Sequence, residues 1–217
     1  MQGHDHTSRR EWLTQALGFL SVTAAPSLAF ANNAAHIVIV GGGVGGATAA
    51  KYLKLFNPQL RVTVIEKNPV YVRPYGSSEV LNQHAKMDDL NVRYDALKSR
   101  YGIEFVFDTV TGLDPQARVI STLGKKKIGY DRLIVSPGIQ LTYNAYAGYS
   151  EAVANQSVPS GWIPGQQTAL LAKQLQGMRQ GGTFVLAAPP NPYRCPPGPY
   201  ERACMVASYF KKAKPKS

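Results

Sequence analysis

The chain has 217 residues, of which 44% are hydrophobic and 17% charged, and its formal net charge is +11. This length and apolar content allow a packed core in one or two domains. Two cysteines are too few for a disulfide-stabilised scaffold. The basic residues form no periodic helix and no nucleic-acid-binding motif, which argues against DNA or RNA as a partner. A basic surface can instead steer an anionic substrate or an acidic partner.

The first 31 residues have the layout of an export signal. Residues 8–13 (SRREWL) resemble the start of a twin-arginine signal, a modestly apolar run follows at residues 16–25, and residues 29–31 (AFA) provide a small-residue cleavage site. The apolar run is too short to span a membrane, so we expect no transmembrane segment here. We therefore expect residues 1–31 to direct a folded protein to the periplasm. An amphipathic leader helix is the alternative.

A glycine-rich turn follows the first strand predicted after this signal. β-Branched residues at 37–40 lead into glycines that fit the pattern G-x-G-x-x-G, and residues 47–56 have helical character. In this pattern the first glycine permits a tight turn, the second lets the backbone approach a pyrophosphate, and the third lets helix and strand pack closely. The glycines expected to bind a dinucleotide are Gly41, Gly43, Gly45 and Gly46.

An acidic residue closes this unit. A second predicted strand at residues 61–65 ends at Glu66, which lies about 20 residues beyond the last glycine, where a carboxylate can accept both ribose hydroxyls. Residues 35–66 therefore predict a dinucleotide-binding βαβ unit. The alternative is an ordinary βαβ unit whose glycines serve packing alone.

Less specific patterns predict the elements that follow. Residues 139–164 are aromatic and loop-like, with no clear assignment. The predicted elements are a loop and short helix at 71–81, a helix at 90–101, a strand at 103–107, a hairpin at 110–113 and 119–123, a turn at 125–129, a strand ending in a Pro-Gly turn at 128–138, a helix at 166–178, and a turn with a buried strand at 181–188.

One of these strands carries a family resemblance. Residues 130–138 resemble the motif Tyr-Asp-x-Leu-(aliphatic)-x-Ala-Thr-Gly of the two-dinucleotide-domain flavoproteins, with Ser136-Pro137 in place of Ala-Thr. In that superfamily this strand end closes on the flavin pyrophosphate. The resemblance implies that Pro137 and Gly138 contact the cofactor and that the backbone at Val110 holds the adenine. It also implies that the cofactor is FAD rather than NAD.

A proline-rich loop at residues 189–199 stands where pyridine-nucleotide flavoenzymes carry a second glycine motif. Proline lacks an N–H, so this loop cannot cradle a pyrophosphate, and we expect no nicotinamide cofactor there. Cys195 follows a predicted strand and precedes a helix predicted at 200–211, a position that favours thiolate chemistry, and Arg194 adds positive charge. We expect a redox role for Cys195, with a structural thiol as the alternative. Cys204 is expected to be a buried packing residue.

Residues 193–203 (YRCPPGPYERA) resemble the signature of the flavoprotein subunit of flavocytochrome c sulfide dehydrogenase. The similarity runs from about residue 37 to the end of the chain. It implies an α/β fold, with a Rossmann-like, glutathione reductase-like FAD-binding domain at 35–150. Residues 151–217 would begin a second dinucleotide-type domain, truncated here.

The same resemblance implies sulfide oxidation. In this family hydrosulfide attacks a redox disulfide above the flavin, and electrons pass through FAD to a separate c-type cytochrome subunit. Cys195 would be one half of that disulfide, with its partner expected beyond Ser217. We do not expect Cys204 to substitute, because cysteines so placed rarely bring their Cα atoms within roughly 7 Å. Glu201 is a candidate acid/base near the flavin, although an acid in the first turn of a helix also complements the helix dipole.

One departure from the family concerns the flavin link. In one branch a cysteine after the second strand tethers FAD, whereas residues 71–80 contain no cysteine and Pro74 occupies the matching position. We therefore expect non-covalent FAD, and no metal site. Two alternatives remain: a sulfide:quinone oxidoreductase-like flavoenzyme, or a truncated flavin-binding remnant without activity.

Overall fold

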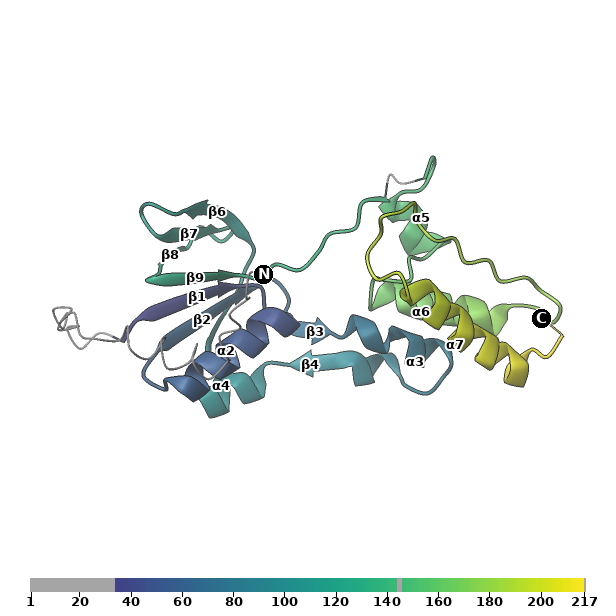
Figure 1. Cartoon of the computed structure of the whole chain (residues 1–217), viewed down its shortest axis with the longest axis horizontal. Helices are drawn as coiled ribbons and strands as arrows, with labels where there is room; N and C mark the ends of the chain where they lie inside the picture. Colours follow the sequence, from purple (N-terminus) through teal and green to yellow (C-terminus); the bar gives the residue numbers. More distant parts are fainter. Residues whose placement is uncertain (1–33, 144–145, 217) are drawn as a thin grey trace, which may run out of the picture. The chain divides into compact units, whose positions relative to one another are not determined.

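The computed structural model describes residues 34–143 and 146–216 (Figure 1). The predicted signal peptide lies outside these residues. The central feature is a four-stranded parallel sheet with the order β5-β2-β1-β9. Its strands are β1 (His36–Val40), β2 (Arg61–Glu66), β5 (Glu104–Phe107) and β9 (Arg132–Val135).

The inner residues of the two central strands, 37–39 of β1 and 62–65 of β2, are buried, as expected for parallel strands covered on both faces. Val38 and Ile39 of β1 and Val64 of β2 are fully buried. Helix α2 (Val44–Phe56) packs on β1 and β2 and contacts α4 (Asp95–Tyr101). The βαβ unit predicted at residues 35–66 is therefore present.

A second, three-stranded antiparallel sheet consists of β6 (Val110–Asp114), β7 (Val119–Thr122) and β8 (Lys127–Gly129). Ile120 of this sheet packs with Val38 and Ile65 of the parallel sheet. The predicted hairpin is confirmed.

The single strand predicted at 128–138 is wrong, and so is the turn predicted at 125–129. The segment divides into β8 and β9, which belong to different sheets. Asp131 causes the division: its Oδ2 accepts the His36 N–H at 2.7 Å, and its own N–H donates to the His36 carbonyl at 2.9 Å.

A two-stranded antiparallel ribbon was not foreseen. Strand β3 (Val70–Val72) pairs with β4 (Asn91–Arg93), so the helix predicted at 90–101 is correct only for α4. Between the two strands lie η1 (Pro74–Gly76), α3 (Ser77–Leu81) and η2 (Met87–Leu90). The loop predicted at the start of 71–81 thus includes a strand and a 3-10 turn.

The remaining helices are α5 (Glu151–Gln156), α6 (Gln166–Gly177) and α7 (Gly198–Ala213). Helices α3, α6 and α7 share a buried cluster that includes Leu81, Leu175 and Phe210. The amphipathic helix predicted at 166–178 is confirmed. Among the described residues, no helix is both long and apolar enough to cross a membrane.

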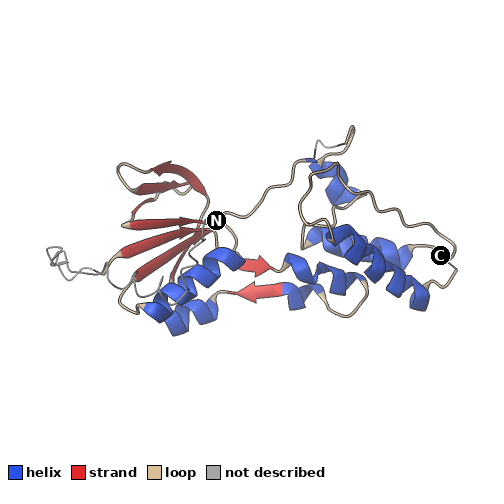
Figure 2. Cartoon of the chain, viewed as in Figure 1, coloured by secondary structure: helices blue, strands red, loops and turns tan. Residues whose placement is uncertain are grey.

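The buried strand predicted at 181–188 is wrong. Figure 2 shows this stretch as a loop between α6 and α7. Val185 is 79% exposed. No strand in the described part of the chain pairs with this segment, and its alternate residues Thr183, Val185 and Ala187 are exposed.

Candidate functional site

The glycine turn after β1 has the geometry that its motif predicts. Gly41 has φ +98°, and a Cβ there would lie 2.1 Å from the Ser136 carbonyl oxygen. A Cβ on Gly46 would lie 1.8 Å from the Gly41 carbonyl oxygen. Glycine is therefore required at both positions, at the first for the turn and at the second for the close approach of α2 to β1.

The N-terminus of α2 is open to a ligand. The helix begins at Val44 with Gly43 as its N-cap, and no side chain caps it and no acidic residue lies in its first turn. The first N–H groups of a helix have no partner within the helix and carry partial positive charge. Gly45 is exposed in this turn, and the nearest atom to a Cβ on Gly43 would be Tyr71 Cε2 at 3.6 Å. The turn therefore fits a pyrophosphate.

Glu66 lies at the carboxyl end of β2 and is held there by two backbone donors. Its Oε2 accepts the Gly42 N–H at 2.7 Å, and its Oε1 accepts the Asn68 N–H at 2.9 Å. The carboxylate is half-buried beside the glycine turn. Its two oxygens have further lone pairs, so it can still accept the hydroxyls of a ribose.

Tyr94 supports the same turn and was missed by the sequence reasoning. Its hydroxyl donates to the Gly42 carbonyl at 3.0 Å, and its ring stacks on Phe105 with centroids 4.5 Å apart. Burial, followed by the nearby charges of Glu66 and Tyr71, raises the pKa of Tyr94 to about 12. No local motif marks this residue, because its contact with Gly42 depends on the tertiary fold.

The end of β9 closes on the glycine turn, as the flavoprotein motif predicts. The Ser136 N–H donates to the Val40 carbonyl at 2.8 Å, and a Cβ on Gly41 would lie 3.2 Å from Pro137 Cα. Gly138 has φ +80°, and a Cβ there would meet no atom within 4 Å. The structure thus brings Pro137 to the turn and leaves Gly138 exposed after it.

Val110, predicted at the adenine, begins β6 next to the carboxyl end of β2. It is half-buried and packs on the cluster formed by Val38, Ile65 and Ile120. The Asp108 N–H, between β5 and β6, donates to the Glu66 carbonyl at 3.0 Å. The role of Val110 at the adenine stays a prediction.

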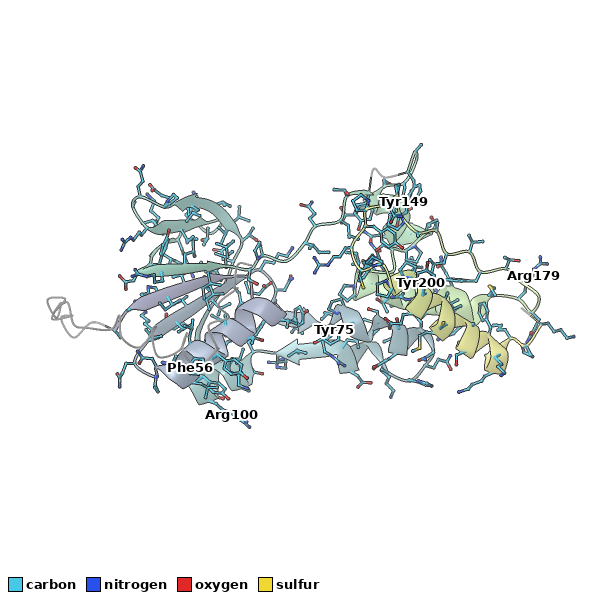
Figure 3. The ribbon with its side chains drawn as sticks, in the orientation of Figure 1. Phe56, Tyr75, Arg100, Tyr149, Arg179 and Tyr200 are labelled. Atoms are coloured by element: carbon cyan, nitrogen blue, oxygen red, sulfur yellow. The ribbon has the colours of Figure 1, made fainter. Side chains whose placement is uncertain are left out.

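A second group of predicted residues lines a cavity of about 800 Å³ that is separate in sequence from the glycine turn. Cys195 and Glu201 both lie in its wall. Its aromatic members include Tyr75 of η1 and Tyr149 before α5, both labelled in Figure 3. The other aromatic members are Tyr143, Tyr146, Trp162 and Phe184.

The proline loop holds Cys195 just before α7. Cys195 has φ +59°, an uncommon left-handed conformation for a residue with a side chain, and its carbonyl accepts the Gly198 N–H at 2.9 Å. Its thiol is free and exposed. Glu201 is exposed in the first turn of the helix, so both the catalytic and the dipole interpretation of this residue fit its position.

The expectation that Cys204 is buried is wrong, since it is free and exposed. The buried face of α7 consists of Val206, Tyr209 and Phe210. Cys204 precedes this set by two residues, which on a helix turns it to the opposite side.

Arg202 is a further cavity residue that the sequence reasoning missed. Its Nη2 donates to the Gly161 carbonyl at 2.6 Å, while its buried Nε has no partner among the described residues. Burial lowers the pKa of Arg202, and the carboxylate of Glu201 opposes that shift. Arg202 lies four residues after Gly198, so both residues lie on the same side of α7. This spacing was the one signal in the sequence that could have placed Arg202 near the cysteine loop.

Two family models match the chain. One, described as pyridine nucleotide-disulphide oxidoreductase, matches residues 35–159. The other, described as the central part of the sulfide dehydrogenase (flavocytochrome c) flavoprotein chain, matches residues 168–217. The first match covers the glycine turn and Glu66, and the second covers Cys195 and Glu201.

Individual relatives agree with these matches. The chain is 32% identical over 112 residues to the sulfide-quinone reductase of Aquifex aeolicus, covering 52% of this chain and 26% of that protein. It is 47% identical over 37 residues to the sulfide dehydrogenase (flavocytochrome c) flavoprotein chain of Chlorobaculum thiosulfatiphilum, covering 17% of this chain and 77% of that sequence. The chain thus spans about a quarter of the length of the Aquifex relative.

Among solved structures, the sulfide:quinone oxidoreductase of Aquifex aeolicus superposes with a TM-score of 0.67 at 24% identity, covering 84% of this chain and 42% of that one. At this identity the likeness establishes the fold. Together with the family match it confirms the predicted α/β class with a Rossmann-like domain of the glutathione reductase type.

Proposed function

Because the chain belongs to the pyridine nucleotide-disulphide oxidoreductase family, we propose that it is part of a flavoenzyme that oxidises sulfide. The observation that carries this proposal is the pairing of two features in one chain. The first feature is the glycine turn after β1, which Glu66 and Pro137 close. The second is a cavity lined by a free cysteine, in the segment where a nicotinamide-dependent flavoenzyme would carry a second glycine motif. The first feature suits a flavin, and the second suits a thiol-based electron donor.

The cofactor is FAD, and the turn after β1 would hold it. The N–H groups at the start of α2 would bind the pyrophosphate, Glu66 would accept the ribose hydroxyls, and the exposed backbone at Pro137 and Gly138 would close over the phosphates. FAD, when bound, supplies a two-electron acceptor. The residues beside it orient it and exclude water.

We propose that Cys195 forms one half of a redox disulfide in the whole enzyme. When hydrosulfide attacks this disulfide, a new sulfur–sulfur bond forms to one cysteine and the other leaves as a thiolate, so the disulfide gains the two electrons that the sulfide loses. Glu201 lines the same cavity, and we propose that it takes the proton of hydrosulfide. The disulfide can re-form once the persulfide has passed its outer sulfur to a second hydrosulfide, and FAD, when bound, would accept the two electrons of the resulting thiol pair.

The proposed final acceptor is a c-type cytochrome subunit. The match of residues 168–217 to the flavocytochrome c chain supports this choice. A quinone is the second candidate, supported by the relative in Aquifex aeolicus. Sulfide-reduced protein mixed separately with oxidised cytochrome c and with a water-soluble quinone will distinguish the two, because only the physiological acceptor should reoxidise the flavin rapidly.

The oxidation itself is tested by flavin absorbance. We expect sulfide to bleach the flavin of the FAD-loaded whole enzyme, which supplies the second cysteine of the proposed disulfide. Cys195→Ser should abolish bleaching, whereas the matched variant Cys204→Ser, which removes the other exposed thiol, should retain it. Bleaching by Cys195→Ser at the wild-type rate would refute the role of Cys195. FAD binding by the wild-type protein without sulfide-dependent bleaching would favour the alternative of an inactive flavin-binding remnant.

The flavin is proposed to be bound without a covalent link, because Pro74 begins η1 in the segment where a tethering cysteine would be needed. Acid precipitation of the protein should therefore release all flavin into the supernatant. Flavin retained in the pellet would contradict this.

We further propose that the protein is periplasmic and is exported by the twin-arginine route, on the pattern of residues 8–31. Replacing Arg9 and Arg10 by lysine should retain the protein in the cytoplasm, as fractionation of expressing cells would show. Replacing Lys211 and Lys212 by arginine is the matched control and should leave export unchanged.

A further inference from the structure

The cavity around Cys195 contains a cation, Arg202, that forms no salt bridge among the described residues, although the adjacent Glu201 carboxylate acts on it electrostatically. Glu201 and Arg202 are the only charged residues in its wall among the described residues. Glu201 is exposed, and the ion pairs of the described residues, Arg61 with Glu104 and Arg93 with Asp95, do not include Arg202. The guanidinium therefore lies in an apolar, aromatic wall with a single hydrogen bond, which it donates to the neutral Gly161 carbonyl.

Burying a cation without an anion is unfavourable, because the charge loses its hydration and gains no compensating partner. The buried and unpartnered Nε of Arg202 shows that this loss is not made up within the described residues. The burial that lowers the pKa of Arg202 has the same physical cause. A cation in this condition increases the affinity of its cavity for anions.

Gly198 and Trp162 lie beside both Cys195 and the segment that Arg202 contacts. Gly198 and Arg202 lie one turn apart on α7, and a Cβ on Gly198 would lie 3.1 Å from the Trp162 ring and 3.6 Å from Cys195 Sγ. Trp162 follows Gly161, and the Gly161 carbonyl accepts the hydrogen bond from Arg202. The thiol, the indole and the guanidinium thus belong to one continuous stretch of the cavity wall.

We propose that Arg202 forms an anion-binding subsite that draws the substrate into this cavity as hydrosulfide, next to Cys195. Choosing hydrosulfide as the natural anion rests on the proposed function, whereas the anion preference itself depends on the cavity alone. Hydrosulfide suits the site because it is small, singly charged and weakly hydrated, so an aromatic wall with one cation can hold it. Arg202 acts here as a specificity-determining residue.

Alkylation of Cys195 tests the anion preference without turnover. In a Cys204→Ser background only Cys195 reacts, and its thiolate displaces iodide from iodoacetate, an anion, or from iodoacetamide, a neutral analogue of similar size. The same thiolate attacks both reagents, so the ratio of the two rates cancels any change in thiolate population. That ratio reports how strongly the cavity favours an anion.

We expect Arg202→Gln to lower the iodoacetate-to-iodoacetamide ratio at least about threefold, as removal of a nearby half-buried charge should. Arg202→Lys keeps the charge and should keep most of the ratio. Lys211→Gln removes an exposed charge from the last turn of the same helix and should leave the ratio unchanged. Arg194→Gln, which removes an exposed charge next to Cys195, should have a smaller effect than Arg202→Gln.

An unchanged ratio in Arg202→Gln would overturn the proposal. So would an equal fall in Arg202→Lys, because the hydrogen bond to Gly161 and not the charge would then be the cause. If Arg202→Gln does not fold, Arg202→Met replaces it. The proposal then requires a lower iodoacetate-to-iodoacetamide ratio in Arg202→Met than in Arg202→Lys, and equal ratios would overturn it.

Sulfide-dependent bleaching separates this subsite from the proposed function. The concentration of sulfide for half-maximal bleaching should rise in Arg202→Gln while the limiting rate changes less. An anion preference without any bleaching would leave the subsite standing and refute sulfide oxidation. Bleaching without an anion preference would support sulfide oxidation and refute the anion-binding subsite.

Discussion

At the scale of single residues, the cofactor turn depends on contacts that exclude a side chain. Gly46 is buried in the first turn of α2 against the Gly41 carbonyl. In Gly46→Ala the new methyl group would have to displace the backbone of the turn. We expect a loss of about 3 kcal/mol or more in the free energy of unfolding, with loss of FAD binding. Thermal unfolding and flavin titration measure both.

The matched control is Gly177→Ala, at the exposed end of α6, where a Cβ would meet no atom within 4 Å. This variant should be neutral or up to about 1 kcal/mol more stable, because alanine favours the helix. Equal stability of Gly46→Ala and Gly177→Ala would contradict the close packing of α2 on the turn.

Glu66 supports the turn by accepting a hydrogen bond and is proposed to bind the ribose. Glu66→Gln keeps the size and one acceptor oxygen but removes the charge, and hydrogen bonds to charged groups contribute about 1.5–3 kcal/mol. We expect FAD to bind at least about tenfold more weakly, as measured by fluorescence titration. Glu104→Gln, which removes the charge from the pair with Arg61 and from the acceptor of the Thr63 hydroxyl, should bind FAD as the wild type does. Equal affinity of the two variants would exclude Glu66 from the site.

At the scale of elements, the segment from β4 to α4 holds the glycine turn through Tyr94, which is 3% exposed. Its pKa in the folded protein is raised to about 12, above the usual value of 10. The folded state therefore binds this proton more tightly than the unfolded state does. The resulting stability is fully present below pH 10 and is lost as the pH rises from about 10 through about 12.

Denaturant unfolding at pH 9 and pH 11.5 tests this dependence. Tyr94→Phe should lose about 1 kcal/mol at pH 9, because the Gly42 carbonyl loses its donor, and should fall less than the wild type between the two pH values. Tyr101→Phe, in α4 and half-buried, is the control for general alkaline effects. The same fall in wild type and Tyr94→Phe would show that Tyr94 is not the group responsible.

Helices α3, α6 and α7 are held together by the apolar cluster that also backs the cavity. Leu175 is 2% exposed within it. Leu175→Ala should therefore cost about 2–5 kcal/mol in unfolding free energy. Leu55→Ala changes a 50% exposed residue of α2 and should cost much less. Chemical denaturation gives both values, and a small loss for Leu175→Ala would mean that the cluster is not packed as described.

At the scale of the whole molecule, the chain is strongly basic, with a net charge of +11. Lys125, Lys126 and Lys127 form an exposed group at the β7–β8 turn. If an acidic cytochrome is the acceptor, its reduction should slow about tenfold between low and physiological ionic strength, because salt screens long-range steering. Reduction of a neutral quinone should show little salt dependence. Stopped-flow absorbance measures both rates.

Replacing these three lysines by glutamine should weaken the salt dependence. The control replaces the exposed tail residues Lys211, Lys212 and Lys216, which changes the net charge equally. Equal effects of the two variants would show that net charge, rather than this group, steers the partner.

Local patterns were enough to predict the elements that are proposed to bind the cofactor. The β-branched run before Gly41, the glycine spacing and the acid at Glu66 depend on neighbours in sequence, and their predicted positions agree with the structure. Strands that need a distant partner were not predictable in this way. The ribbon of β3 and β4 was missed and residues 181–188 were predicted wrongly, because an apolar or alternating stretch becomes a strand only when another strand pairs with it.

The sequence by itself determined the chemistry that each segment can carry: a dinucleotide-type turn from its glycines, a carboxylate proposed to accept ribose hydroxyls from Glu66, and a thiol from Cys195. Only the tertiary structure decided which groups meet. It placed Pro137 against Gly41, Tyr94 under Gly42, and the unpaired Arg202 in the cavity with Cys195. The reason is physical: conformational preference and residue chemistry act locally, whereas burial, and the loss of hydration that burial causes, depend on segments far apart in the chain.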